Sequence, residues 1–145
     1  MAPDDPLGRG VFSSASAKRW RRGTEGGDTN SFKGGKDESS LSVDRLGLAA
    51  DKVMTAIGDV IAEGREGKRT FYGWAVVTVE NATRMRRSVR ATPKLSNPYN
   101  PYHDNPYHAD IDLHLAEGAE RQDARIEHAK DLADRAYWKE RFVAD

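Results

Sequence analysis

Residues 107–115 read YHADIDLHL, and this stretch decides the predicted fold. From Ala109 to Leu115 every second side chain is apolar, whereas the alternate positions carry imidazoles and carboxylates. A period of two is typical of a β-strand, because successive side chains of a strand point to opposite faces. We therefore expect the apolar side of this strand to face a hydrophobic core. The polar side is expected to face solvent and contains His108, Asp110, Asp112 and His114.

The tripeptide Asn-Pro-Tyr occurs three times around the start of this strand, at residues 97–99, 100–102 and 105–107. Proline fixes its own φ and pushes the preceding residue away from the helical region, so these steps predict a stiff, extended loop. The loop is expected to present Tyr99, Tyr102 and Tyr107. A loop without a chemical role is the preferred interpretation of this repeat.

The remaining elements are predicted from the spacing of apolar residues. Residues 41–43 favour a short extended piece, and the apolar residues between Leu46 and Ile61 fall three or four apart, which is typical of a helix. Asp44 is expected to cap this helix and Gly64 to end it. The residues expected on its buried face are Leu46, Ala49, Ala50, Val53, Ile57, Val60 and Ile61.

Two more strands and a second helix follow. Residues 70–80 are rich in aromatic and β-branched side chains, which predicts a central strand with both faces covered. Residues 86–92 predict a weaker strand beside it, joined by a turn at residues 81–84. Residues 117–142 predict a long amphipathic helix with Ile126, Ala129, Leu132, Ala133, Ala136 and Tyr137 on one stripe.

Together these elements predict an α+β fold. We expect a small, mostly antiparallel sheet of three to four strands with two helices packed on one face. Residues 1–40 are rich in Gly, Ser, Asp and Lys and contain few apolar side chains, so they are expected to form an irregular, partly basic arm. Residues 41–145 are expected to form a single α+β domain, since 145 residues suit one domain.

Composition excludes several classes of protein. The 23 Lys and Arg residues equal the 23 Asp and Glu residues, so no net field draws the chain to nucleic acid or to an anionic membrane. The absence of Cys excludes disulfides and thiolate sites. The first ten residues lack the features of a signal peptide, and no segment approaches the roughly 20 apolar residues of a spanning helix. We expect a cytoplasmic protein without membrane contacts.

The polar row of the strand at residues 107–115 contains the two residues that we consider candidates for a catalytic or metal-binding role. His108 beside Asp110 is suited to proton transfer, because a carboxylate orients an imidazole and shifts its pKa. The same two residues are candidate ligands of a divalent metal. No nucleophile elbow, HExxH motif, Walker loop or G-x-G-x-x-G accompanies them. A solvent-facing polar row is therefore the preferred interpretation, and no resident cofactor is predicted.

A binding surface is the alternative use of the polar residues. The residues that we assign to it are the basic arm at Lys18, Arg19, Trp20, Arg21 and Arg22, the strand residues Arg86, Arg87 and Arg90, and Tyr99, Tyr102 and Tyr107. Arg and Tyr are frequent at the centres of protein interfaces. The same arginines neutralise phosphates, and Trp20 is able to stack on an unpaired base, so single-stranded nucleic acid remains an alternative ligand.

Three short motifs resemble a family pattern. LSVDR at residues 41–45, GWAV at residues 73–76 and NPYHADI at residues 105–111 are together similar to a family of small bacterial proteins of about this size to which no activity is attached. The resemblance implies that the residues before Leu41 are the variable part, and it implies no catalytic residue.

We therefore expect a small cytoplasmic binding protein that serves as an accessory subunit of a bacterial multi-component system. A protein partner is the expected ligand and nucleic acid the other option. The alternative is a hydrolase or transferase that uses His108 with Asp110, with or without a divalent metal.

Overall fold

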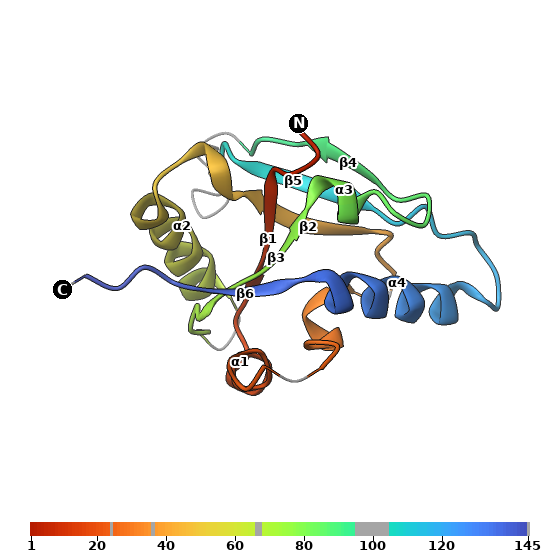
Figure 1. Ribbon diagram of the computed structural model, residues 1–145, viewed down its shortest axis with the longest axis horizontal. Coiled ribbons are helices and arrows are strands. Elements are labelled where there is room, and N and C mark those ends of the chain that lie inside the picture. Colours follow the sequence, from red (N-terminus) through yellow and green to blue (C-terminus); the bar gives the residue numbers. More distant parts are fainter. Residues whose placement is uncertain (24, 36, 66–67, 95–104, 145) are drawn as a thin grey trace.

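The structure is a computed structural model that describes residues 1–23, 25–35, 37–65, 68–94 and 105–144 (Figure 1). The described residues form an antiparallel sheet of six strands in the order β4-β5-β2-β1-β3-β6, together with four α-helices. The α+β class is therefore confirmed, whereas the predicted three to four strands and two helices are too few. The strands are β1 (Pro6–Val11), β2 (Ser40–Arg45), β3 (Gly73–Thr78), β4 (Ser88–Ala91), β5 (His108–Asp112) and β6 (Tyr137–Glu140). The helices are α1 (Ser14–Arg21), α2 (Asp51–Gly64), α3 (Val79–Ala82) and α4 (Arg121–Arg135), with short 3₁₀ turns η1 (Thr29–Phe32) and η2 (Leu46–Leu48).

The helices cover both faces of the sheet rather than one. One core joins the odd-numbered residues of β1, β2, β3 and β5 to α1, η1 and α4, and it includes Trp20, Phe32 and Leu132. A second core on the opposite face places α2 and η2 over Trp74 and Val76 of β3. In Figure 1, α2 accordingly stands apart from α1 and α4. The second core includes no residue of β1, β2, β4 or β5, yet Asp44 of β2 and His108 of β5 are buried, so the expectation that His108 faces solvent was wrong.

The N-terminal residues form the middle of the sheet, so the prediction of an irregular arm before residue 41 was wrong. β1 lies between β2 and β3 and is registered with β3 along all six of its residues. Its sequence, PLGRGV, lacks the apolar alternation that reveals a strand. The reason is Gly8: a Cβ there would lie 2.7 Å from Cδ1 of Trp74. Glycine is therefore needed for the indole to lie across the strand.

Strand β5 confirms the extended backbone expected near residue 108. His108–Asp112 form the strand, and Ala109 and Ile111 are fully buried in the first core. The alternation stops at His114, whose φ is 50°. The strand at β3 is also confirmed as central, because Ala75 and Val77 face one core while Trp74 and Val76 face the other.

Strand β4 lies far from its predicted neighbour. The sequence places it beside β3, but it is paired with β5 at the other end of the sheet. The expected hairpin turn at residues 81–84 is replaced by α3 and the crossing that follows it. Arg87, the residue before β4, makes the long-range contacts that hold the strand in this position.

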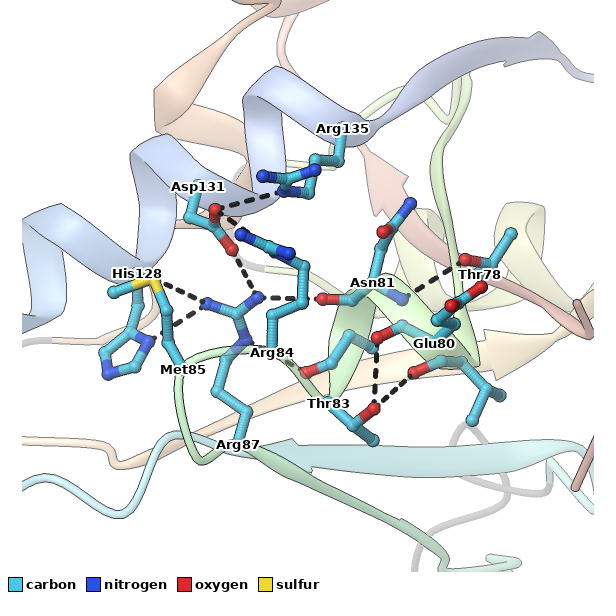
Figure 2. A network of polar contacts seen from close by, with 12 residues as sticks. Thr78, Glu80, Asn81, Thr83, Arg84, Met85, Arg87, His128, Asp131 and Arg135 are labelled. Carbon is cyan, nitrogen blue, oxygen red and sulfur yellow. Dashed lines mark hydrogen bonds and ion pairs between the residues drawn. The ribbon is translucent and has the colours of Figure 1, made fainter. Parts of the chain in front are cut away.

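Arg87 anchors the crossing to α4 (Figure 2). Its side chain is fully buried; Nε donates to the carbonyl oxygen of Ala82 at 2.9 Å, and Nη2 donates to that of Asn81 at 2.9 Å. Nη2 also contacts Oδ2 of Asp131 at 2.6 Å, and Nη1 contacts Nδ1 of His128 at 3.1 Å. A buried guanidinium with these partners holds the start of β4 against α4.

Both long helices differ from their predictions. α2 begins at Asp51 after Ala50, and Asp44 is a buried residue of β2 rather than its cap. α2 buries Met54, Thr55, Gly58 and Ala62, while Val53 and Val60 of the predicted face are 43% and 45% exposed. A Cβ at Gly58 would lie 2.7 Å from Phe71, so small residues bring this other face onto the sheet.

The predicted C-terminal helix is shorter than expected. α4 ends at Arg135, and the next residues form β6, the edge strand beside β3. The buried stripe at Ala129, Leu132 and Ala133 is confirmed. The prediction ran on to residue 142 because Ala136 and Tyr137 continue the helical spacing of apolar residues, whereas Ala136 has extended backbone angles.

Candidate functional site

The sheet opens between β1 and β2. Their register covers two residue pairs, Leu7 with Arg45 and Gly8 with Asp44, while β2 continues alongside β5 for five pairs. The side chain of Arg9 bridges the opening: Nη1 donates to the carbonyl oxygen of Ser42 at 2.9 Å, and Nε donates to that of Ser31 at 3.2 Å. The two strands separate here, and the guanidinium of Arg9 satisfies the carbonyl of Ser42 in β2 and that of Ser31 in η1.

A cavity of about 530 Å³ lies over this opening and extends to the C-terminal end of α2. Phe12 and Ile61 supply apolar wall, and the backbones of Gly8, Gly10 and Gly64 supply surface without side chains. The polar wall consists of Arg9, Ser42, Asp44, Arg65, Lys94, Asn105 and His108. The cavity therefore combines an apolar side with a convergent set of hydrogen-bonding and charged groups.

Asp44 is the buried carboxylate of this cavity. Its Oδ1 accepts a hydrogen bond from Nδ2 of Asn105 at 2.7 Å, and its Oδ2 accepts one from Nε1 of Trp74 at 3.3 Å. Burial raises the pKa of Asp44, and the hydrogen bonds from Asn105 and Trp74 oppose that rise. The carboxyl group is held in one orientation by two donors that come from β3 and from the residues before β5.

His108 lies opposite Asp44 in the register of β2 and β5. Its Nδ1 is 3.0 Å from the carbonyl oxygen of Thr92 and 2.8 Å from the Thr92 hydroxyl. Because a carbonyl oxygen accepts only, the hydrogen of the neutral ring is on Nδ1 and the lone pair is on Nε2. Burial lowers the pKa of His108, and Lys94 adds to that effect, so the neutral ring is favoured.

The Nε2 atom of His108 is buried and has no hydrogen-bond partner within the described ranges. The whole side chain is 8% exposed, and Oδ1 of Asp110 lies 3.9 Å from Nε2, beyond hydrogen-bonding distance. The Thr92 hydroxyl donates to Oδ2 of Asp110 at 3.0 Å. The predicted pair, His108 and Asp110, is thus brought together through Thr92 on one face of the sheet.

The described residues hold no group of three or more His, Asp or Glu side chains arranged for a metal ion. His108 and Asp110 would therefore need further ligands from elsewhere to hold a metal ion. The pair as it stands is suited to hydrogen bonding and proton transfer by His108.

The basic residues of the predicted contact surface have diverse surroundings. On α1, Trp20 is buried and its Nε1 donates to Oγ of Ser31 at 2.9 Å. Arg19 pairs with Asp28 at 2.6 Å, Arg21 pairs with Glu140 at 2.7 Å, and Lys18 and Arg22 are exposed. Trp20, Arg19 and Arg21 are therefore bound to other residues of the protein, whereas Lys18 and Arg22 face solvent.

The other residues of that surface are similarly divided. Arg86 and Arg90 are exposed, whereas Arg87 is buried in the network described above. Tyr107 is half-buried and packs against the second core. Tyr99 and Tyr102 lie outside the described residues.

Sequence reasoning missed most of the cavity. Asp44 was interpreted as a helix cap and Asn105 as part of a turn, although each is a buried hydrogen-bonding group in the structure. Arg9, between two glycines in a segment without apolar alternation, has no sequence signal that marks it. The alternation in β5 did identify His108, because a strand pattern shows which residues share a face.

Within the described part of the chain, no helix is both long and apolar enough to span a bilayer. Comparison of the chain with models of protein families, with curated proteins and with solved structures found no significant match.

Proposed function

We propose that the protein binds a small organic molecule in the cavity between α2 and the opening of the sheet. The observation that carries this proposal is the unpartnered Nε2 of His108 on a residue that lines the cavity. A buried polar atom without a partner costs about 1–3 kcal/mol. A ligand that reached Nε2 and donated a hydrogen bond to it would remove that cost.

Size and chemistry support the same conclusion. Cavities of roughly 300–1,000 Å³ with mostly apolar walls and a few fixed polar groups are typical of small-molecule sites. This cavity is about 530 Å³, and its Asp44 and Asn105 side chains are already ordered by hydrogen bonds. Groups that are ordered before binding lose little entropy when a ligand arrives. The protein partner predicted from the sequence remains a separate hypothesis for the exposed basic residues.

A variant that fills the cavity tests this proposal. Ser42→Phe places a ring in the cavity from an exposed position of β2, so it should abolish ligand binding without unfolding the protein. The measurement is a ¹H–¹⁵N correlation spectrum recorded against a panel of soluble metabolites that includes nucleosides, aromatic amines, carboxylic acids and phosphorylated metabolites. We expect saturable shifts at residues that line the cavity, and their loss in Ser42→Phe.

The matched control is Ser40→Phe, which adds the same ring two residues away on the same strand face but outside the cavity lining. It should bind the same compounds as the unmodified protein. Binding that survives in Ser42→Phe, or a panel without any saturable ligand, would contradict the proposal.

General-base catalysis by His108 is the second candidate function, because a neutral ring with its lone pair on Nε2 is able to take a proton from a bound hydroxyl or from water. The proton would move to Nε2 and the oxygen would attack an electrophilic centre of the ligand. The bond from that centre to the displaced group would then break, and the displaced group would leave with the proton from Nε2, as in a hydrolase or transferase. We expect ligand turnover, followed by NMR, to be lost in His108→Asn and kept in His114→Asn, which removes an exposed imidazole. A ligand that is bound and recovered unchanged would exclude this role.

A further inference from the structure

A second cavity of about 270 Å³ adjoins the first. Arg9, Gly10, Phe12 and Arg65 line both cavities, so the two are immediate neighbours. The smaller part lies among the start of α1, the η1 turn and the residues that follow α2. Its walls are polar and include Arg69 and Ser13, the residue that precedes the first turn of α1.

Three arginines, Arg9, Arg65 and Arg69, line this smaller cavity. Most arginines that contact other elements pair with a carboxylate; Arg19, Arg87 and Arg141, for example, approach theirs to 2.6 Å. Within the described ranges, no carboxylate lies within ion-pairing distance of Arg9, Arg65 or Arg69. The cavity therefore has a concentration of positive charge that the described residues do not neutralise directly.

The positions of these groups are held by other parts of the fold. Arg9 is tied to the carbonyl oxygens of Ser31 and Ser42, and the guanidinium of Arg65 lies 4.2 Å from the centre of the Phe12 ring. Burial lowers the pKa of Arg9 and the charge of Arg65 lowers it further, while the charges of Glu38 and Asp44 oppose this effect. Holding like charges together is unfavourable unless an anion is shared between them.

The hydroxyl groups of Ser31 and Ser13, which lie beside the cavity, differ in whether they are free to donate a hydrogen bond to a ligand. The hydroxyl of Ser31 donates to Asp28 at 2.7 Å, so it is not directed to a ligand. The charge of Asp28 is in turn offset by Arg19 at 2.6 Å. Ser13 accepts a hydrogen bond from the backbone nitrogen of Ser16, which leaves the hydroxyl proton of Ser13 to donate elsewhere.

We propose that this smaller cavity binds a phosphate group, and that the small molecule of the proposed function is phosphorylated. This inference rests on the proposed function only for the part of the ligand in the larger cavity. Phosphate suits the site because guanidinium groups bind phosphate oxygens through paired, charge-assisted hydrogen bonds. Arg9, Arg65 and Arg69 come from β1 and from the residues after α2, and the phosphate would direct its organic substituent past Gly10 toward Asp44 and His108.

Inorganic phosphate alone provides the test, because it needs no knowledge of the organic part. Amide shifts are followed by NMR as phosphate replaces chloride at constant ionic strength. We expect saturable shifts at Gly10, Ser13 and Ser14, and a loss of phosphate affinity of about tenfold in Arg69→Gln, as expected for one charge-assisted hydrogen bond. Arg65→Gln should weaken binding to a similar degree.

The matched control is Arg22→Gln, which removes the same charge from an exposed arginine at the end of α1, outside both cavity linings. Its phosphate affinity should equal that of the unmodified protein. Shifts that do not saturate, or that weaken equally in Arg22→Gln and Arg69→Gln, would show general charge screening and would overturn the proposal.

The failure of this inference is distinguishable from the failure of the proposed function. Ser42→Phe fills the larger cavity and leaves Arg69 and Ser13 in place, so it should still bind inorganic phosphate. Phosphate binding without any organic ligand would refute the proposed function alone. Organic ligands that bind as well to Arg69→Gln as to the unmodified protein would refute the phosphate group alone.

Discussion

Replacing Arg87 with alanine should lower the free energy of unfolding by about 3–5 kcal/mol, as expected when one partner of a buried ion pair is removed. The substitution leaves the carbonyl oxygens of Asn81 and Ala82 without their donors and leaves Asp131 without its 2.6 Å contact (Figure 2). Since these contacts hold β4 and α3 against α4, the loss is expected to loosen both elements. Urea denaturation followed by circular dichroism measures the change.

Two variants define the cause of this effect. Arg86→Ala removes the neighbouring exposed arginine and should change the free energy of unfolding by less than about 0.5 kcal/mol. Arg87→Lys keeps the charge but loses the planar set of donors, so its stability should lie between those of Arg87→Ala and the unmodified protein. Equal stability of Arg86→Ala and Arg87→Ala would refute an anchoring role for Arg87.

Replacing Asp44 with alanine should lower the free energy of unfolding by about 2–4 kcal/mol. The substitution leaves two buried donors without an acceptor, at a cost of about 1–3 kcal/mol each. The donors are the amide of Asn105 and the indole of Trp74. Removal of a buried carboxylate offsets part of this loss. The same substitution removes the central acceptor of the larger cavity, so we expect ligand binding to be lost as well. Urea denaturation near neutral pH provides the measurement.

The pH dependence of stability distinguishes the titration of Asp44 from a loss of stability that is the same at every pH. Burial raises the pKa of Asp44 above its ordinary value of 3.8. The folded protein therefore binds a proton at Asp44 more readily than the unfolded chain does, so proton binding stabilises the folded protein at low pH. This stabilisation is lost as the pH rises through the pKa of Asp44 in the folded protein. Asp44→Ala should lose this contribution, so its deficit relative to the unmodified protein should grow as the pH falls toward 3.8.

The control for this series is Asp112→Ala, which removes a carboxylate on the same polar face whose side chain is 46% exposed. It should cost less than about 1 kcal/mol near neutral pH. A constant deficit for Asp44→Ala as the pH falls would contradict a raised pKa.

Part of the candidate site can be predicted from the sequence. The alternation around residue 108 places His108 and Asp110 on one face, and the structure joins them through Thr92. The remaining groups meet only by folding: Arg9 comes from β1, Asp44 from β2, and Arg65 and Arg69 from the residues after α2. These residues have no common spacing in the chain, so no local pattern could have brought them together.

By itself the sequence determined the α+β class, the extended backbone of β5 and the presence of two amphipathic helices, because each follows from which neighbouring side chains share a face. Only the tertiary structure decided that β1 lies in the middle of the sheet, that β4 lies at its edge and that α2 turns Met54 rather than Val53 inward. The physical reason is that these choices depend on contacts between distant residues. Gly8 admits Trp74, Gly58 admits Phe71, and Arg87 reaches Asp131, and none of these pairs is close in sequence.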